Sequence, residues 1–530
     1  MPSVQEYDGV LLGAGHNTLV LQAYLGRAGL KTLCLERRSV AGGGLSTVED
    51  RRRPGFLHNT HSFYHRAINQ MPWYKDLDLE RLGARYIEPP LNVALLLRNG
   101  DVLEWWTDFE RTIESFARFS TKDSKALRRW RDEFLPIVES ILGPESMAPP
   151  LPVDERMRRW ERSAEGRRLL AVSKLSPIEF VHSEFENPVI RAGLLFFNGL
   201  REVDLRAPGF GHHIPALLAS RHKAQMCVGG SAELAKAFVT AVEQTGGGIR
   251  LNTLPRQIVI ENGRAVGVET TDGNYFRASL FVASGLNPIQ TFVELIREGV
   301  LPAAWREKAT AYRFNLLAPL FSLNVNLTEA PRYTATDRCP NVSEAFMTIL
   351  GLEDSAQFNE IVSKHESGEI SSTVMWGSCP SIFDPSQAPP GKHTAFMWEK
   401  LPYKLRGNPE NWDRERETHG QRMLDVWSQF APGLRDSLLD YSVQTPLDTE
   451  RTLPNMRYGD LLVGSLSEGQ TGAGRPFAGA GHYRSCVPNL YLCGSSSHPG
   501  GNITGLPGYN CAQVLTGDLG IARFRVFGEC

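Results

Sequence analysis

Residues 7–18 have the sequence YDGVLLGAGHNT, and this stretch decides the fold. A short apolar run ends in a glycine turn, then a helical pattern and a second apolar run follow, and the second run ends at Glu36. This order of strand, turn, helix and strand is typical of a dinucleotide-binding βαβ unit. Gly13 permits the sharp turn, and Gly15 lets the backbone approach a diphosphate that the amides at the helix N-terminus bind.

Two further positions refine this interpretation. Glu36 lies 21 positions after Gly15, where a carboxylate accepts hydrogen bonds from the hydroxyls of an adenosine ribose and repels the extra phosphate of NADP. Thr18 stands where the fingerprint has its third glycine, so a glycine turn in some other α/β protein is the alternative. The preceding strand, the following helix and the acid together favour the dinucleotide site.

A second glycine-rich segment lies near the C-terminus. Residues 489–503 have the sequence NLYLCGSSSHPGGNI, which predicts a strand, a glycine-rich loop and then a helix that begins near Thr504. Such a loop at a helix N-terminus is typical of a second anion-binding site. Between the two sites, four strand-like segments over 249–283 with two hairpin turns predict a small antiparallel meander. Two such binding sites at opposite ends of the chain suggest that separated segments hold one long cofactor.

The composition excludes several classes of protein. The 530 residues carry a net charge of −2, which gives no electrostatic case for nucleic-acid binding. The N-terminus lacks a basic segment followed by an apolar one, and no run approaches the roughly 20 apolar residues of a membrane span. We therefore expect a cytoplasmic protein. The arginine-rich segment 155–170 predicts a solvated helix, with peripheral contact with a membrane as the alternative.

The cysteines form no C-x-x-C pair and no zinc-ligand spacing. We therefore predict no metal site, and the sequence lacks the closely spaced redox pair of a flavin disulfide reductase. The cysteines are instead typical of small buried side chains in a reducing compartment. They are Cys34, Cys227, Cys339, Cys379, Cys486, Cys493, Cys511 and Cys530.

These segments resemble the phytoene desaturase group of FAD-dependent oxidoreductases. The resemblance rests on GAGHN at 13–17, Glu36 and the glycines at 42–44. The loop over 489–503 is more specific and resembles the branch that contains the cyanobacterial-type β-carotene ketolase and the pyridine nucleotide-disulfide oxidoreductase domain-containing proteins. GGSAEL at 229–234 agrees with this branch. The resemblance covers most of the chain and implies FAD as the cofactor.

The implied fold is α/β, with a Rossmann-type FAD-binding domain like that of monoamine oxidases and phytoene desaturases. That domain is discontinuous in sequence, and a substrate domain of mixed sheet and helices covers the flavin ring. The resemblance assigns 1–70, 220–290 and 445–530 to the FAD-binding domain. It assigns 71–219, largely helical, and 291–444 to the substrate domain.

The resemblance also implies which residues contact FAD. Pro255 departs from the pattern, because proline cannot donate a backbone hydrogen bond to adenine. We therefore expect Leu254 or Arg256 to contribute to the adenine site. The full set of implied contacts is Gly13, Gly15, His16, Asn17, Glu36, Arg37, Gly42, Gly43, Leu254, Pro255, Arg256, Gly494, Ser495, Gly501, Asn502 and Ile503.

Desaturation requires a base, because a proton leaves the carbon next to the one that gives up the hydride. A histidine near neutrality suits this task. Residues 55–65 contain three histidines and a tyrosine, and His498 lies in a His-Pro-Gly turn, where a structural role is favoured. Which of them acts stays open. The candidates are His58, His61, Tyr64, His65 and His498, with Glu399 as a weaker one.

The predicted function is dehydrogenation or oxidation of an apolar or cyclic organic substrate by hydride transfer to flavin N5. No second dinucleotide fingerprint appears in the sequence, so oxygen, a quinone or a protein is expected to reoxidise the flavin. A soluble small molecule is slightly favoured over a carotenoid, and a homo-oligomer is compatible with the sequence. The alternatives are a non-catalytic flavin-fold binding or regulatory protein, a carotenoid ketolase or desaturase acting at a membrane, and an NAD-dependent dehydrogenase.

Overall fold

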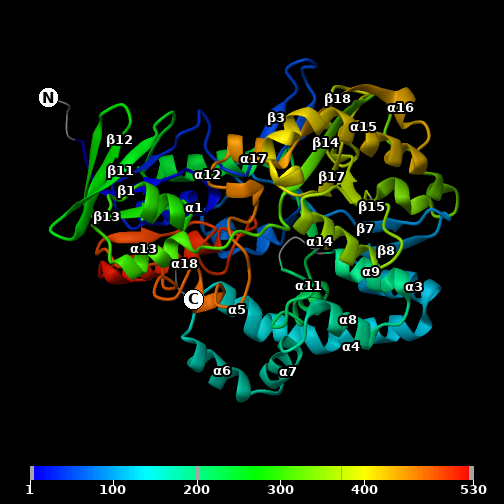
Figure 1. Ribbon diagram of the computed structural model, residues 1–530, viewed down its shortest axis with the longest axis horizontal. Coiled ribbons are helices and arrows are strands. Elements are labelled where there is room, and N and C mark those ends of the chain that lie inside the picture. The colour runs from blue at the N-terminus through cyan, green and yellow to red at the C-terminus, as the bar shows by residue number, and fades with distance from the viewer. Residues whose placement is uncertain (1–4, 198–202, 372, 524–530) are drawn as a thin grey trace.

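The computed structural model describes residues 5–197, 203–371 and 373–523, so Cys530 lies outside the described part. Two seven-stranded sheets dominate it, and a lobe of helices extends from one side (Figure 1). Mixed sheets with covering helices confirm the predicted α/β class. Among the described residues, no helix combines the length and apolar character that crossing a membrane requires.

The first sheet is mainly parallel, with the order β10-β2-β1-β13-β12-β11 and with β19 paired to β13. Strands β2 and β13 flank β1 in parallel, β10 continues beyond β2, and β11 and β12 form an antiparallel edge. The strands are β1 (Gln5–Leu12), β2 (Thr32–Leu35), β10 (Gly248–Arg250), β11 (Pro255–Glu261), β12 (Arg264–Thr270), β13 (Tyr275–Ser284) and β19 (Leu490–Leu492).

One expectation about this sheet is wrong. The first of the four strand-like segments after residue 248 does not join the meander, because β10 pairs in parallel with β2. The physical reason is that parallel neighbours are joined by a long connection and not by a hairpin, and the connection from β2 to β10 spans residues 36–247. The meander therefore consists of β11, β12 and β13 only.

Three helices pack together on the first sheet: α1 (His16–Arg27), α12 (Ala232–Gln244) and α18 (Leu506–Asp518). Helices α12 and α18 both contact α1, and their buried side chains form one cluster with Leu11 and Phe281 of the sheet. Although α1 and α18 come from opposite ends of the chain, they lie side by side, blue and red in Figure 1. The predicted helix after the C-terminal loop is confirmed.

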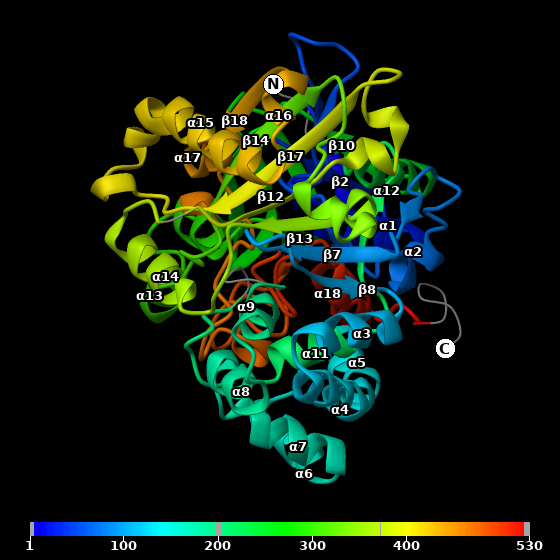
Figure 2. The same cartoon turned by 90° about the vertical axis from the view of Figure 1, so that its right-hand side faces the viewer.

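The second sheet has the order β18-β14-β17-β16-β15-β7-β8. Helix α15 (Trp412–Phe430) shares one core cluster with it, and the helical lobe shares another, so both faces are buried (Figure 2). The strands are β7 (Leu91–Leu96), β8 (Val102–Trp106), β14 (Leu320–Leu327), β15 (Met347–Leu350), β16 (Met375–Ser378), β17 (His393–Lys400) and β18 (Leu438–Gln444).

The helical lobe differs from the expected single helix over 155–170. That segment forms α6 and α7, because the Ser163 hydroxyl accepts a hydrogen bond from the Gly166 amide and so begins a new helix. The lobe consists of α3 (Phe109–Phe119), α4 (Thr121–Ile137), α5 (Gly143–Ser146), α6 (Val153–Glu161), α7 (Ala164–Ser173), α8 (Pro177–Glu184), α9 (Pro188–Phe197) and α11 (His213–Ala219).

Smaller elements connect the two sheets. Strands β3 and β4 pair with each other, and β9 pairs with both β5 and β6. Helix α17 follows β18 and leads back toward the first sheet. These elements are β3 (Thr47–Glu49), β4 (Leu57–Asn59), β5 (His65–Arg66), β6 (Tyr86–Ile87), β9 (Ala224–Cys227), α2 (Pro72–Asp76), α13 (Ala303–Thr310), α14 (Gln357–Ser367), α16 (Leu434–Ser437) and α17 (Pro446–Thr452).

Candidate active site

A cavity of about 340 Å³, the nucleotide cavity below, lies at the carboxyl ends of the parallel strands. Gly13 follows β1, Glu36 follows β2, Gly285 follows β13 and Gly494 comes two residues after β19, and all four line it. Open parallel sheets bind nucleotides at this edge, because loops from neighbouring strands converge there. The segment 452–456, which follows α17, also lines the cavity.

The start of α1 is suited to an anion. Its N-cap is Gly15, no side chain caps the helix, and its first turn contains no acidic residue, so its first amides are left for a ligand. Gly13 has φ +80°, which favours glycine, and a Cβ atom at Gly15 would meet open space. Both glycines line the cavity. The turn therefore offers backbone donors to a diphosphate without a side chain in the way.

Contacts between residues far apart in sequence join the two predicted anion-binding sites. The Asn17 side-chain amide donates to the Ser495 hydroxyl at 3.0 Å, and the His16 ring donates through Nε2 to the Asn502 carbonyl at 3.1 Å. Burial lowers the pKa of His16 to about 4, so its ring is neutral. The opening glycine turn and the C-terminal loop (residues 494–503) therefore lie against each other.

Unsatisfied buried groups at this junction fit a bound cofactor. The side-chain oxygen of Asn17, which lines the nucleotide cavity, is buried and has no hydrogen-bond partner within the part of the chain that the structure describes. The hydroxyls of Ser496 and Ser497 are also buried without such a partner, but these two residues line neither cavity. Leaving a buried polar atom unpaired costs about 1–3 kcal/mol, so such atoms mark a place where a ligand is expected. The donor set of glycine turn, serine hydroxyls and asparagine amide suits the phosphates and sugar of a dinucleotide.

Glu36 occupies the position expected of the ribose-binding acid. Its carboxylate is buried, lines the nucleotide cavity, and accepts hydrogen bonds from the Ala14 and Arg38 amides, each at 2.9 Å. A carboxylate accepts about four hydrogen bonds, so acceptor positions are left for ribose hydroxyls. The same bonds hold the ends of β1 and β2 together at the cavity.

The predicted FAD contacts divide into two groups. Gly42 donates its amide to the Ala14 carbonyl at 2.7 Å and so lies behind the cavity wall. Arg256 is exposed and pairs with Glu269 across the meander, away from the lining. Gly501, Asn502 and Ile503 also lie outside the lining. The residues that do line it are Gly13, Gly15, His16, Asn17, Glu36, Arg37, Gly43, Leu254, Pro255, Gly494 and Ser495.

The structure explains how Thr18 replaces the third glycine of the fingerprint. That glycine normally lets the helix pack closely on the sheet, and here the space is left by Gly285 at the end of β13. A Cβ atom at Gly285 would lie 2.2 Å from the Thr18 hydroxyl oxygen. The glycine that permits close packing is therefore at the end of β13 (Gly285) and not in the helix, and the helix still packs closely on the sheet.

A second and larger cavity, of about 1850 Å³, lies beside the C-terminal loop. Its walls come from the helical lobe and from the segments 466–474 and 498–499, and most of them are apolar. Ser495 lines the nucleotide cavity, while His498 and Pro499 of the same loop line the larger one. The two cavities therefore share one loop as a common border.

His498 is the predicted catalytic residue that borders the larger cavity. Its Nε2 atom lies 3.0 Å from the Glu145 carbonyl oxygen, which only accepts, so Nε2 carries the proton and Nδ1 carries the lone pair. Burial lowers the pKa of His498 to about 4. The ring is therefore neutral at physiological pH and is able to accept a proton at Nδ1.

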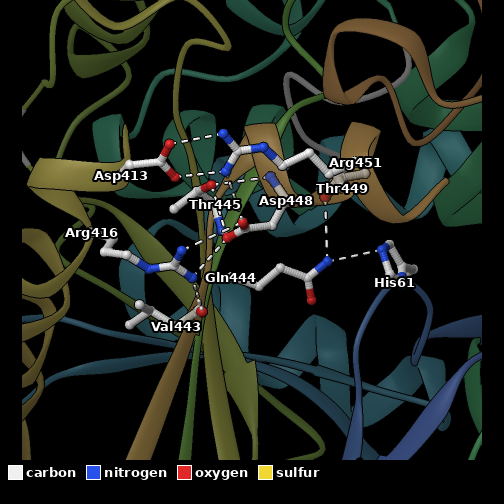
Figure 3. Close-up of polar contacts among 9 residues, drawn as sticks. All are labelled: His61, Asp413, Arg416, Val443, Gln444, Thr445, Asp448, Thr449 and Arg451. Carbon is white, nitrogen blue, oxygen red and sulfur yellow. Dashed lines mark hydrogen bonds and ion pairs between the residues drawn. The ribbon is translucent and has the colours of Figure 1, made fainter. Parts of the chain in front are cut away.

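The other predicted bases line neither cavity. His61 accepts a hydrogen bond from the Gln444 amide at 2.8 Å and contacts Thr60, and burial lowers its pKa to about 3. Gln444 also donates to Thr449 of α17, whose first turn is stabilised by reciprocal hydrogen bonds between Thr445 and Asp448 (Figure 3). His61 thus joins its loop to the helix that leads to the 452–456 wall of the nucleotide cavity.

His58 and His65 are also buried. Both ring nitrogens of His58 are engaged, by Asn326 at 2.9 Å and Thr394 at 3.1 Å. His65 bonds the Tyr86 hydroxyl at 2.8 Å, and its Nε2 has no partner among the described residues. Burial lowers the pKa of His65 to about 3. A catalytic role for either residue stays a prediction.

The remaining two candidates lie within the second sheet and its core. Tyr64 packs edge-on against Phe346 and Trp398 at ring distances of 5.1 and 5.8 Å. Glu399 pairs with His419 of α15 at 2.7 Å, on the face of the sheet that α15 covers. Neither residue borders the two cavities.

Known proteins align with the whole chain. A limonene dehydrogenase subunit of Castellaniella defragrans is 30% identical over 541 residues, which cover 98% of this chain and 96% of that protein. This chain belongs to the phytoene desaturase-like family of FAD-dependent oxidoreductases. It is therefore an enzyme of the oxidoreductase class, and its cofactor is FAD. Protein-family models, by contrast, give no match.

Other members and a solved structure agree with this family. Pyridine nucleotide-disulfide oxidoreductase domain-containing protein 2 of Mus musculus is 29% identical, covering 97% of this chain and 94% of that protein. The lycopene-forming phytoene desaturase of a Paracoccus strain is 24% identical, over 97% and 98%. A putrescine oxidase variant superposes with a TM-score of 0.61 over 98% of this chain and 100% of that chain, at 12% identity, which shows a shared fold.

Proposed function

We propose that this oxidoreductase dehydrogenates an apolar organic substrate in the larger cavity, with cyclic terpenes as the first class to test. The observation that carries the proposal is the shared C-terminal loop, which borders both the nucleotide cavity and a mainly apolar cavity large enough for such a molecule. The full-length similarity to a limonene dehydrogenase supports the substrate class.

The same proposal includes the division of the chain. The FAD-binding domain consists of 1–70, 220–290 and 445–530, and the substrate domain consists of 71–219 and 291–444. The membership of the two sheets supports these bounds, because strands β1, β2, β10–β13 and β19 form the first sheet and strands β7, β8 and β14–β18 form the second. The predicted FAD contacts that line the nucleotide cavity are the residues we propose to hold the cofactor.

FAD supplies a hydride acceptor at its flavin ring when it is bound. The chain itself must orient the substrate, exclude water and remove the proton that the neighbouring carbon loses. We propose His498 for the last task, because no hydrogen bond among the described residues engages its Nδ1, while the Glu145 carbonyl fixes its ring. The Glu145 side chain is held in turn by Arg156 and Trp160, each at 2.7 Å. One hydride and one proton leave, and a new carbon–carbon double bond remains.

Anaerobic mixing of the holoenzyme with a panel of cyclic terpenes tests this function. We expect bleaching of the flavin absorbance with at least one member, and a rate that is flat from pH 6 to 8 because His498 has a pKa of about 4. His498→Ala is expected to slow bleaching by roughly 100-fold or more, the usual contribution of a general base, with FAD still bound. Stopped-flow absorbance measures the rate.

His222→Ala is the matched control, because His222 lines neither cavity. We expect its bleaching rate to stay within about threefold of the parent protein. An inflection near pH 6.5 in the parent protein, or equal losses in the two variants, would exclude His498 as the base. No bleaching across the panel, with FAD bound, would contradict the substrate class.

We further propose that the mouth of the larger cavity contacts a membrane surface, from which an apolar substrate enters. Val153 and Met157, one turn apart on α6, line the cavity and yet are 63% and 40% exposed, so they mark its opening. Exposed arginines on the same helix suit anionic lipid. Oxygen or a quinone is the acceptor that we propose for the electrons.

Flotation with phosphatidylglycerol vesicles tests the membrane contact. The parent protein is expected to float with these vesicles, and the double variant Val153→Glu/Met157→Glu is expected to lose most of that binding. Val300→Glu/Leu316→Glu changes apolar side chains that are 45% and 65% exposed elsewhere, and it should float like the parent. Equal loss in both variants, or no flotation of the parent, would refute the contact.

A further inference from the structure

The C-terminal loop faces both cavities, so its position sets how cofactor and substrate lie relative to each other. A second segment, 462–466, does the same, because Val463 lines the nucleotide cavity and Leu466 lines the larger one. The two segments lie in direct contact. A Cβ atom at Gly501 would lie 2.2 Å from the Leu462 carbonyl oxygen, so only glycine fits there. Whatever holds these segments together therefore fixes the geometry of the reaction.

Arg475 lies at the junction of the two segments and is fully buried. Its guanidinium donates to the Ser495 carbonyl of the C-terminal loop at 3.0 Å. It also donates to the Ser465 carbonyl at 2.9 Å and the Gly464 carbonyl at 3.3 Å, both in the second segment. A planar guanidinium donates several hydrogen bonds in a fixed geometry, so this one side chain bonds the carbonyls of both segments. A lysine ammonium does not present its donors in this way.

The electrostatic setting of Arg475 is unusual for a buried cation. Within the described residues, the hydrogen-bond acceptors of its guanidinium are all backbone carbonyls, and its Nε is buried without a partner. The nearby Asp460 carboxylate is already engaged by three backbone amides, at 2.7 to 2.9 Å. Burying a charge without an ion pair is costly, so a structural filler at this position would be an apolar residue.

The backbone of the C-terminal loop is shaped around this guanidinium. Gly500 has φ +134°, and a Cβ atom there would lie 3.6 Å from the Arg475 Nε and 3.2 Å from Leu466. The loop backbone at Gly500 therefore lies beside the Arg475 guanidinium, in a conformation that favours glycine. The contact between Gly500 and Arg475 joins the C-terminal loop to the second segment. In that loop, Ser495 lines the nucleotide cavity and the turn at 498–499 lines the larger cavity.

We propose that Arg475 is a positioning residue for the reaction: it holds the C-terminal loop so that Ser495 faces FAD while His498 faces the substrate. The part that concerns FAD is independent of the substrate, whereas the part that concerns His498 rests on the proposed function. Arg475 touches neither reactant itself and acts through the Ser495 carbonyl and the segment 462–466.

Arg475→Lys and Arg475→Gln test the proposal. Fluorescence titration of apoprotein with FAD is expected to show a dissociation constant raised about 10- to 100-fold, the range for lost hydrogen bonds to a charged group. With FAD saturating, flavin bleaching by substrate should slow at least as much, while the substrate concentration for half-maximal rate changes less than about twofold. In Arg475→Ala, millimolar ethylguanidinium should restore FAD affinity, because it refills the site.

Arg191→Lys is the matched control, since Arg191 also donates to two backbone carbonyls, at 2.6 and 3.1 Å, but lines neither cavity. It should leave FAD affinity unchanged even if it lowers the melting temperature. Unchanged FAD affinity in both Arg475 variants, equal losses in Arg191→Lys, or no rescue by ethylguanidinium would overturn the proposal. If no substrate bleaches the flavin at all, the proposed function fails, while the FAD titration still decides the role of Arg475.

Discussion

Lowering the pH from 7.5 to 5 is expected to unfold this protein and release its FAD. Burial lowers the pKa of five histidines that are at most 9% exposed far below the usual 6.5 of this side chain. It also lowers the pKa of the half-buried His212 to about 3. The pKa is about 3 for His61 and His65 and about 4 for His16, His365 and His498. Two of these residues, His16 and His498, line the two cavities.

The direction follows from which state binds protons. Below pH 6.5 the unfolded chain takes up a proton at each histidine, while the folded protein does not until the pH approaches 4, so stability falls as the pH falls between these values. At pH 5.5 each of these histidines lowers the free energy of unfolding by about 1.4 kcal/mol, and the five together lower it by on the order of 7 kcal/mol. That is comparable with the whole free energy of unfolding of a typical domain, about 5–15 kcal/mol.

Denaturant unfolding at a series of pH values measures this effect. His365→Gln removes one of the five groups at α14, outside the lining of both cavities, and should reduce the slope of unfolding free energy against pH by about 1.4 kcal/mol per pH unit. His482 is exposed, so His482→Gln should leave the slope unchanged. A stability that stays constant between pH 7.5 and 5 would show that these histidines are not buried as neutral rings.

The sequence predicts those parts of the site where the backbone itself must approach a ligand. At Gly13, Gly15 and the C-terminal loop, close approach demands glycine, and helix starts and strands flank the glycines in a local order that a sequence records. The sequence predicts that the two glycine-rich segments hold one cofactor, and in the structure the hydrogen bond between Asn17 and Ser495 brings them together. The family comparison confirms FAD as the cofactor.

Other parts of the site have no local signal. The larger cavity is formed by ordinary apolar, polar and charged side chains of the helical lobe and of the segment 466–474, which only long-range packing brings together. The wall at 452–456 carries no motif, and Arg475 differs from a surface arginine only by its burial. The pairing of a strand can also be misjudged locally, as that of β10 was, because its partner β2 is far away in the sequence and the strand residues do not record it.

Gly285→Ala is expected to damage both the packing of α1 and the nucleotide cavity. The added Cβ atom would lie 2.2 Å from the Thr18 hydroxyl oxygen, well inside van der Waals contact, and 3.0 Å from the Leu12 carbonyl oxygen. Thr18 is buried in α1 and cannot move away without shifting the helix that begins the diphosphate site. Overpacking of this kind typically costs about 1–3 kcal/mol, occasionally more, and here we also expect loss of bound FAD.

Thr18→Ala in the same chain should repair the damage, because it removes the one atom that overlaps and keeps a good helix former in α1. The double variant should recover at least about 1 kcal/mol of stability and most of its FAD relative to Gly285→Ala, measured by thermal unfolding and flavin content. Gly517→Ala, in α18 with open space around the new atom, should be neutral or slightly stabilising. Additive losses in the double variant would mean that Gly285 does not make room for Thr18, and the replacement of the third glycine would then need another physical cause.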